Sequence, residues 1–136
     1  MRALGLDVGS RRIGVALSDE LKITAQPLVV LVAKSRRDAV ARIRALCAEH
    51  EVDTIVIGLP LSMSGGDRGS SAARARELAG LLAEAVTAEI VMRDERFTTA
   101  EAERVLIQGN VRRADRRAVV DKIAAALILQ GYLDAR

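Results

Sequence analysis

Three acidic residues stand where an unpaired carboxylate would be costly. Asp7 lies inside the apolar segment 3–8, Glu95 lies two residues after the predicted strand 88–93, and Asp121 follows two valines. A carboxylate in such a setting needs a cation or a set of hydrogen bonds. Carboxylate oxygens are the ligands that Mg²⁺ and Mn²⁺ prefer, and such ions promote displacement at phosphorus. The three acids therefore predict a divalent-metal site for phosphodiester hydrolysis.

Each acid taken alone has a simpler interpretation. Asp7 could cap the turn that follows it, and Glu95 or Asp121 could pair with a basic neighbour in the sequence. Three such acids in an arginine-rich chain favour a shared cation instead, because carboxylates close together raise one another's pKa unless a cation neutralises them.

The elements that must position these acids can be predicted from the spacing of apolar residues. Residues 3–8 and 12–18 are expected to form a hairpin. Residues 22–33 are expected to form a third strand, for which Pro27 indicates an edge position or an irregular start. Ser35 and Asp38 resemble a capping box. The remaining predicted elements are a helix from there to residue 50, a strand at 54–58, a loop at 59–71, a helix to 86, a strand at 88–93, a short helix at 98–109, a basic linker at 110–117 and a final helix to 133.

This order predicts the α/β class and a single domain over residues 1–136. The first three strands form an antiparallel meander, and the two later strands pair in parallel through helical crossovers. The result is a mixed five-stranded sheet flanked by helices on both faces. Glu95 then lies at the carboxyl end of the last strand, where ligands collect in open α/β sheets.

Side-chain periodicity indicates how Asp7 and Asp121 are presented. On a strand, Asp7 shares a face with Ala3, Gly5 and Gly9, so we expect free space beside its carboxylate. On the final helix, the residues three, four and seven positions after Asp121 are all apolar. Asp121 is therefore expected to project from the helix face that packs on the sheet.

Composition favours an anionic partner in a reducing compartment. All but three of the 21 basic residues are arginine, which recognises phosphate and carboxylate bidentately. The single Cys47 excludes an internal disulfide and is expected to be a core residue. The longest apolar run, 123–129, is too short to cross a bilayer, and no signal segment opens the chain. We therefore expect a cytoplasmic protein with no membrane partner. Aromatic residues are too few for base stacking, so contacts to a nucleic-acid backbone should dominate.

Five sequence blocks in a fixed order carry a family resemblance over essentially the whole chain. They are 5–10 (Gly-Leu-Asp-Val-Gly-Ser) with 13–16 (Ile-Gly-Val-Ala), 57–61 (Ile-Gly-Leu-Pro-Leu), 94–99 (Asp-Glu-Arg-Phe-Thr-Thr), 120–125 (Val-Asp-Lys-Ile-Ala-Ala) and 128–133 (Ile-Leu-Gln-Gly-Tyr-Leu). In these blocks the chain resembles the YqgF family, bacterial proteins with a ribonuclease H-like fold that are also described as Holliday junction resolvases. The resemblance departs in the loop after Pro60, where Ser62 and Ser64 replace the family's usual Asn and Asp.

The resemblance implies a metal-dependent nuclease that matures the 5′ end of 16S ribosomal RNA. The family's acidic triad falls on Asp7, Glu95 and Asp121, as catalytic residues and as ligands of Mg²⁺ or Mn²⁺. The implied partners are an rRNA precursor or branched DNA, with ribosomal particles as a further partner, for a monomer or a homodimer. The arginines expected to hold phosphates are Arg11, Arg12, Arg68, Arg74, Arg96, Arg112, Arg113, Arg116 and Arg117.

Three other functions compete with this one. A junction-cutting DNA endonuclease would use the same acids and would need two sites related by a two-fold axis. A non-catalytic accessory protein would bind nucleic acid without cutting it. The segment Asp7-Val8-Gly9 also occurs in actin-like ATPases, but those enzymes close nucleotide between two domains, and this chain has the length of one.

Overall fold

The computed structural model describes residues 1–59, 70–94 and 113–136, which form five strands and three helices. The elements are β1 (Arg2–Val8), β2 (Arg12–Ser18), β3 (Ala25–Val32), α1 (Arg36–His50), β4 (Val52–Leu59), α2 (Ser70–Ala85), β5 (Glu89–Asp94) and α4 (Arg113–Ala135). Among these residues no helix has the length and apolarity needed to cross a membrane.

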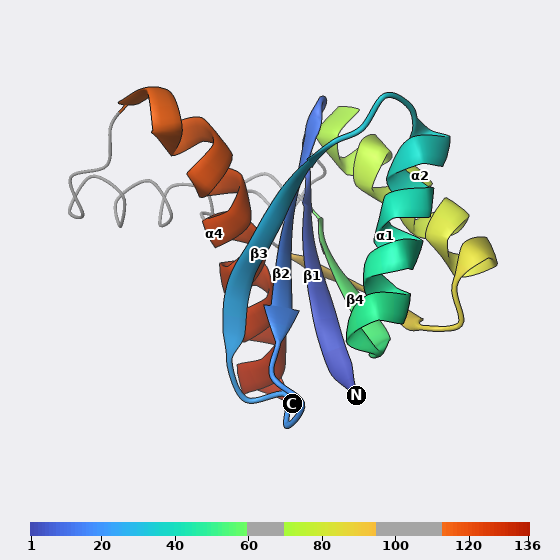
Figure 1. The fold of residues 1–136 in the computed structure, drawn as a ribbon, viewed down its shortest axis with the longest axis vertical. Coiled ribbons are helices and arrows are strands. Elements are labelled where there is room, and N and C mark those ends of the chain that lie inside the picture. The colour runs from blue at the N-terminus through green and yellow to red at the C-terminus, as the bar shows by residue number, and fades with distance from the viewer. Residues whose placement is uncertain (60–69, 95–112) are drawn as a thin grey trace.

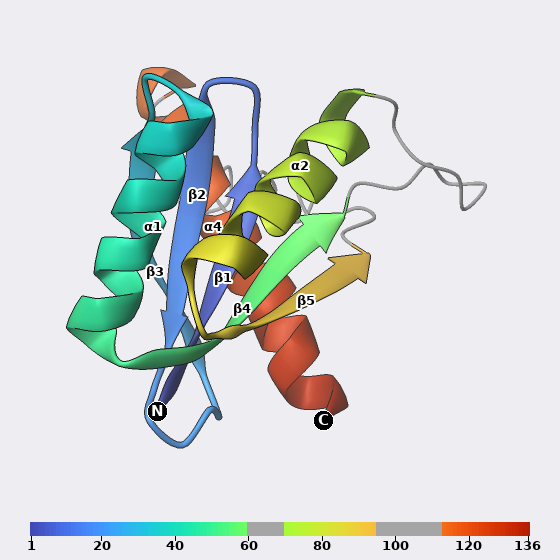
Figure 2. The ribbon, with the colours of Figure 1, turned by 90° about the vertical axis from the view of Figure 1, so that its right-hand side faces the viewer.

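The strands form one mixed sheet in the order β3-β2-β1-β4-β5. The pairs β1–β2 and β2–β3 are antiparallel, whereas β4 pairs in parallel with both β1 and β5. Figure 2 shows that β1, β4 and β5 all end at the side of the sheet where α1 and α2 begin. The predicted meander, parallel pair and flanking helices are confirmed.

The first two strands are joined by a tight turn. The Gly9 N–H donates to the Arg12 carbonyl at 2.8 Å, which closes the turn over Ser10 and Arg11. The predicted hairpin is therefore confirmed.

Strand β3 lies at the sheet edge, as Pro27 predicted. The register between β2 and β3 shifts by one residue at the proline, because Val15 pairs with Val29 but Ala16 pairs with Pro27. The strand begins at Ala25 rather than at the predicted residue 22. Its expected first residues form a turn instead: Lys22 has a φ of 57°, and the Ile23 and Thr24 N–H groups donate to Asp19 Oδ1 at 2.7 and 3.0 Å.

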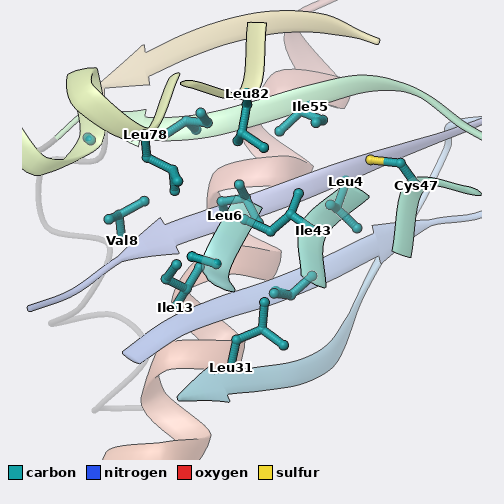
Figure 3. Packing of buried hydrophobic residues seen from close by; sticks show 14 of the residues in the cluster. Leu4, Leu6, Val8, Ile13, Leu31, Ile43, Cys47, Ile55, Leu78 and Leu82 are labelled. Atoms are coloured by element: carbon teal, nitrogen blue, oxygen red, sulfur yellow. The ribbon is translucent and has the colours of Figure 1, made fainter. Parts of the chain in front are cut away.

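Helices cover both faces of the sheet, and each face has its own core (Figure 1). One core packs between α1, α2 and the sheet; Figure 3 shows Leu4, Leu6 and Ile13 of the strands meeting Ile43 and Leu78 of the helices. The other core packs small residues of β1 and β2 against α4. Its buried members are Ala3, Ala16, Val56, Ala125, Ile128, Leu129 and Leu133.

Two sequence expectations about the helices have different outcomes. The N-cap half of the predicted capping box is confirmed, because the Asp38 N–H donates to Ser35 Oγ at 3.1 Å. The Asp38 carboxylate accepts from the Lys34 N–H at 3.0 Å rather than from the N–H of Ser35. The predicted basic linker, 110–117, is wrong from residue 113 onward, because α4 begins at Arg113. Residues 113–119 contain neither Gly nor Pro, and Arg and Ala are good helix formers, so charge alone did not mark a loop. The predicted helix 98–109 lies outside the described residues.

Cys47 is a core residue of α1, as predicted, and its burial gives a testable pH dependence. Burial raises the pKa of the thiol from 9.0 to about 11. The folded protein therefore keeps this proton at a pH where the unfolded chain releases it, so stability falls as pH rises from 9 towards 11. We expect a loss of up to about 1.4 kcal/mol per pH unit in that window. Urea unfolding of the wild type and of Cys47→Ala at pH 8 and pH 10.5 measures it. A decline of the same size in both proteins would contradict this origin.

Candidate functional site

Asp7 is presented on the face of the sheet that α4 covers. It is a half-buried residue near the end of β1, in line with Ala3 and Gly5 of the α4-facing core. Its cross-strand partner on β2 is Gly14, whose missing side chain would point to the same face. The environment of the Asp7 carboxylate is therefore set by what packs over Gly14.

What packs over Gly14 is the main chain of Asp121. A Cβ atom added at Gly14 would overlap the carbonyl group of Asp121. The next helical turn faces the sheet as predicted, because Ala124 and Ala125 are fully buried. Asp121 itself is partly buried, with Oδ2 shielded from solvent. The structure thus brings two of the three predicted acids to one place, although 114 positions separate them in the sequence.

The small residues around Asp7 serve close helix packing, and the free space expected beside the carboxylate is largely taken by α4. A Cβ at Gly5 would lie 2.7 Å from Leu129 Cβ and 2.8 Å from the Ala125 carbonyl oxygen. Both distances are shorter than van der Waals contact allows. Gly5 and Gly14 therefore let the helix backbone approach the sheet closely, and this approach places Asp121.

Arg12 brings a positive charge into contact with Asp121. It lies two residues before Gly14 on β2 and so shares its face. Its Nε atom is 2.9 Å from Asp121 Oδ2, and the two side chains are 34% and 22% exposed. The sequence suggested Arg117 or Lys122 as cations for Asp121, and the ion pair described in the structure is made by Arg12.

A hollow of about 650 Å³ opens beside this ion pair. It lies between the β1–β2 turn, the end of β3 and α4. Its described lining consists of Gly9, Ser10, Arg11, Arg12, Val32 and Asp121. Two arginines and a carboxylate at one opening suit a ligand that carries both negative charge and a bound cation.

The other predicted site residues are placed as follows. Arg11 is exposed in the turn, and Arg74 lies in the first turns of α2, where an Nη atom donates to Ser71 Oγ at 3.2 Å. Arg113, Arg116 and Arg117 belong to the first turns of α4. Glu95, Arg68, Arg96 and Arg112 lie outside the described residues. Strand β5 ends at Asp94, directly before Glu95. Within the described ranges no three Asp, Glu, His or Cys side chains form a metal-binding group, so the triad stays a prediction.

Gly14 is the site residue that sequence reasoning did not single out. It stands in the block 13–16, but only the pairing of β1 with β2 shows that it is opposite Asp7. The spacing of small residues could have indicated it. Gly14 and Ala16 lie on one face of β2, as Ala3 and Gly5 do on β1, and such a face of small residues allows a helix to approach the sheet closely.

The contribution of Arg12 to stability can be measured. We expect Arg12→Ala to lower the free energy of unfolding by about 1 kcal/mol, because it leaves the shielded Asp121 oxygen without this cation. Arg36→Ala is the matched control, since Arg36 pairs with Glu77 at 3.1 Å between side chains that are 41% and 54% exposed. Such an exposed pair contributes roughly 0–1 kcal/mol, usually near the lower end. Urea denaturation at neutral pH compares them, and equal losses would contradict a special role for Arg12.

Comparison with known sequences identifies close relatives of the whole chain. A protein from Pelotomaculum thermopropionicum is 49% identical over 137 residues, which cover all of this chain and 88% of its own. A protein from Clostridium botulinum is 44% identical over 135 residues, covering 99% and 98% of the two chains. Both carry the name "Putative pre-16S rRNA nuclease".

Comparison with solved structures shows the fold to be RuvC-like, that is, ribonuclease H-like, as predicted. RuvC of Thermus thermophilus in complex with a Holliday junction substrate superposes with a TM-score of 0.62 at 16% identity, over 100% of this chain and 95% of that one. The fowlpox virus resolvase in complex with junction DNA gives 0.60 at 10% identity, over 99% and 98%. The family model described as "RuvX: Holliday junction resolvase" matches residues 1–135. The chain therefore belongs to the RuvX family, nucleases that hydrolyse phosphodiester bonds.

Proposed function

We propose that this protein is a divalent-metal-dependent nuclease whose ion is held by Asp7, Asp121 and Glu95. The observation that carries the proposal is the packing of the Asp121 main chain over Gly14, the cross-strand partner of Asp7. That packing supports the proposal because it brings the backbone of two acidic residues from distant segments to the same end of one sheet face. Glu95 is included because it directly follows β5, which is parallel to β1 and ends on the same side of the sheet.

The described residues fit a hard divalent cation. Carboxylate oxygens are its preferred donors, and a guanidinium already lies 2.9 Å from Asp121 Oδ2, so this position accommodates positive charge. A bound ion of this type would lower the pKa of a coordinated water and stabilise the charge that develops on the phosphoryl oxygens. Mg²⁺ and Mn²⁺ are the candidates.

The chain's own residues have distinct tasks in this proposal. Asp7 and Asp121 hold the ion, and Glu95 either completes its ligands or orients the attacking water. Arg11 and Arg12 line the adjoining hollow and would neutralise substrate phosphates. The Arg12 guanidinium would contact both Asp121 and a substrate phosphate. Substrate binding would then influence the position of Asp121, one of the proposed metal ligands.

The substrate that we propose is precursor 16S ribosomal RNA, cut during maturation of its 5′ end in the cytoplasm. The names of the full-length relatives support this choice. Branched DNA is the second candidate, because the family description and the junction-bound structural neighbours point to it. Binding to ribosomal particles would accompany the first substrate, and a two-fold dimer would accompany the second.

A cleavage panel tests this proposal and separates its branches. Precursor 16S RNA, a four-way DNA junction and single strands are each incubated with Mg²⁺ or Mn²⁺, using the wild type and Asp7→Asn. We expect metal-dependent cutting of the RNA precursor by the wild type only. Cutting of the junction alone would establish the DNA branch. Binding without cutting under every condition would instead establish an accessory protein.

A further inference from the structure

A second hollow lies across the β1–β2 turn from the one beside Asp121. Its volume is about 260 Å³, and it opens on the face of the sheet that α1 and α2 cover. Its floor is apolar and its rim is polar. The described lining consists of Val8, Ile13, Ala33, Ala39 and Leu78 on the apolar side and Gly9, Ser10, Arg11, Lys34, Ser35 and Arg36 at the rim.

The rim carries positive charge, part of which has no acidic partner among the described residues. Three of the lining residues are basic and none is acidic. In the part of the chain that the structure describes, Arg36 pairs with Glu77, whereas Arg11 and Lys34 form no ion pair. Asp38, the acid nearest in sequence, is already engaged by the Lys34 N–H and by Arg42 Nε at 3.6 Å. Two exposed cations therefore remain available to an anionic ligand.

The two hollows adjoin the same turn. Both are lined by Gly9, Ser10 and Arg11, the residues of the β1–β2 turn. Gly9 has no side chain and Ser10 a short one, so an extended polymer can cross this turn without a steric barrier. A chain of phosphates that occupies the hollow at Asp121 and continues over the turn would next meet Lys34.

We propose that this second hollow binds a backbone phosphate of the substrate strand away from the bond that is cut, with Lys34 and Arg11 as its cations. This inference rests on the proposed nuclease function and extends it by assigning a positioning site to Lys34. The spacing between the hollows would fix which phosphate of a bound strand reaches the acids. Arg11 lines both hollows and would contact the strand where it crosses the turn.

The test measures nucleic-acid binding without divalent metal, so that cleavage plays no part. Dissociation constants of wild type, Lys34→Ala and Arg44→Ala are measured with precursor 16S RNA and a four-way DNA junction between 50 and 300 mM salt in EDTA. Arg44 is the matched control because it is an exposed cation of α1 that lines a different pocket, with Cys47, Ala48 and Glu51. Circular dichroism verifies that each variant is folded.

We expect Lys34→Ala to weaken binding roughly threefold to tenfold at low salt and to lower the slope of log Kd against log salt by about 1. Lys34→Arg should restore both values, and Arg44→Ala should change neither. Equal effects of Lys34→Ala and Arg44→Ala, or an unchanged slope for Lys34→Ala, would overturn the assignment while leaving the nuclease proposal intact. Absence of binding by the wild type in EDTA would also overturn this assignment, whereas the nuclease proposal depends on the metal-dependent cleavage panel.

Discussion

Replacing Asp7 with asparagine is expected to lower the cleavage rate by roughly 10²–10³-fold or more, the scale on which removal of one charge-stabilising group acts. Asparagine has nearly the same shape but only one acceptor oxygen and no charge, so it is a poor ligand for a hard cation. Asparagine is nearly isosteric with aspartate, so the variant should fold as the wild type does, with little change in Tm. Single-turnover cleavage and thermal unfolding measure the two effects.

Asp53→Asn is the control for the loss of one negative charge. Asp53 lies near the start of β4, at the opposite end of the sheet, and pairs with Lys22 Nζ at 2.7 Å. Its replacement should leave the cleavage rate unchanged. Nucleic-acid binding by Asp7→Asn should be retained, because the arginines are untouched. Normal cleavage by Asp7→Asn would remove Asp7 from the metal site, whatever the family relationship.

Gly14→Ala is expected to be more destabilising than an added methyl group at Gly5, Gly9, Gly80 or Gly131. The new Cβ would overlap the Asp121 carbonyl, so α4 must move away from the sheet. Overpacking of this kind costs about 1–3 kcal/mol and sometimes more. We place Gly14→Ala at the upper end, about 3 kcal/mol with a Tm lower by roughly 10 °C, because main chain has to shift rather than a side chain. Cleavage should fall as well, since Asp121 moves with the helix.

Gly80→Ala is a control that is expected to raise stability rather than lower it. Gly80 lies in α2, and an added Cβ would have no atom within 4 Å. Alanine is the better helix former there, so this variant should be more stable by about 0.5–1 kcal/mol. Calorimetry of both variants tests the pair of predictions. A Gly14→Ala protein as stable as the wild type would show that α4 does not approach β2 as described.

The sheet could be predicted from the sequence because its signals are local. The turn at 9–11, the proline at residue 27 and the apolar run at 54–58 each mark one strand, and the order of elements then fixes the parallel and antiparallel pairs. The sequence also predicted that Asp121 lies on the sheet-facing side of α4, because helical periodicity places it on the same face as the buried Ala124 and Ala125.

The contacts of the site could not be predicted because they join distant segments. Nothing near Arg12 in the sequence indicates that it pairs with Asp121. The sequence neighbours of Asp121 include other cations that could equally well pair with it. The role of Gly14 needs both the β1–β2 register and the position of α4. The start of α4 was missed for another reason: a cluster of arginines is compatible with a solvated helix as well as with a loop.

The placement of α4 also determines when during synthesis the site can exist. All five strands precede this helix along the chain, and the face formed by Ala3, Ala16 and Val56 has no other cover in the described structure. A nascent chain that has emerged only to residue 112 can pair its strands but lacks Asp121. Until α4 docks, this apolar surface lacks the cover that α4 provides, and apolar surface of this kind is prone to aggregation during folding. Nuclease activity would then be acquired late, as the closing helix docks.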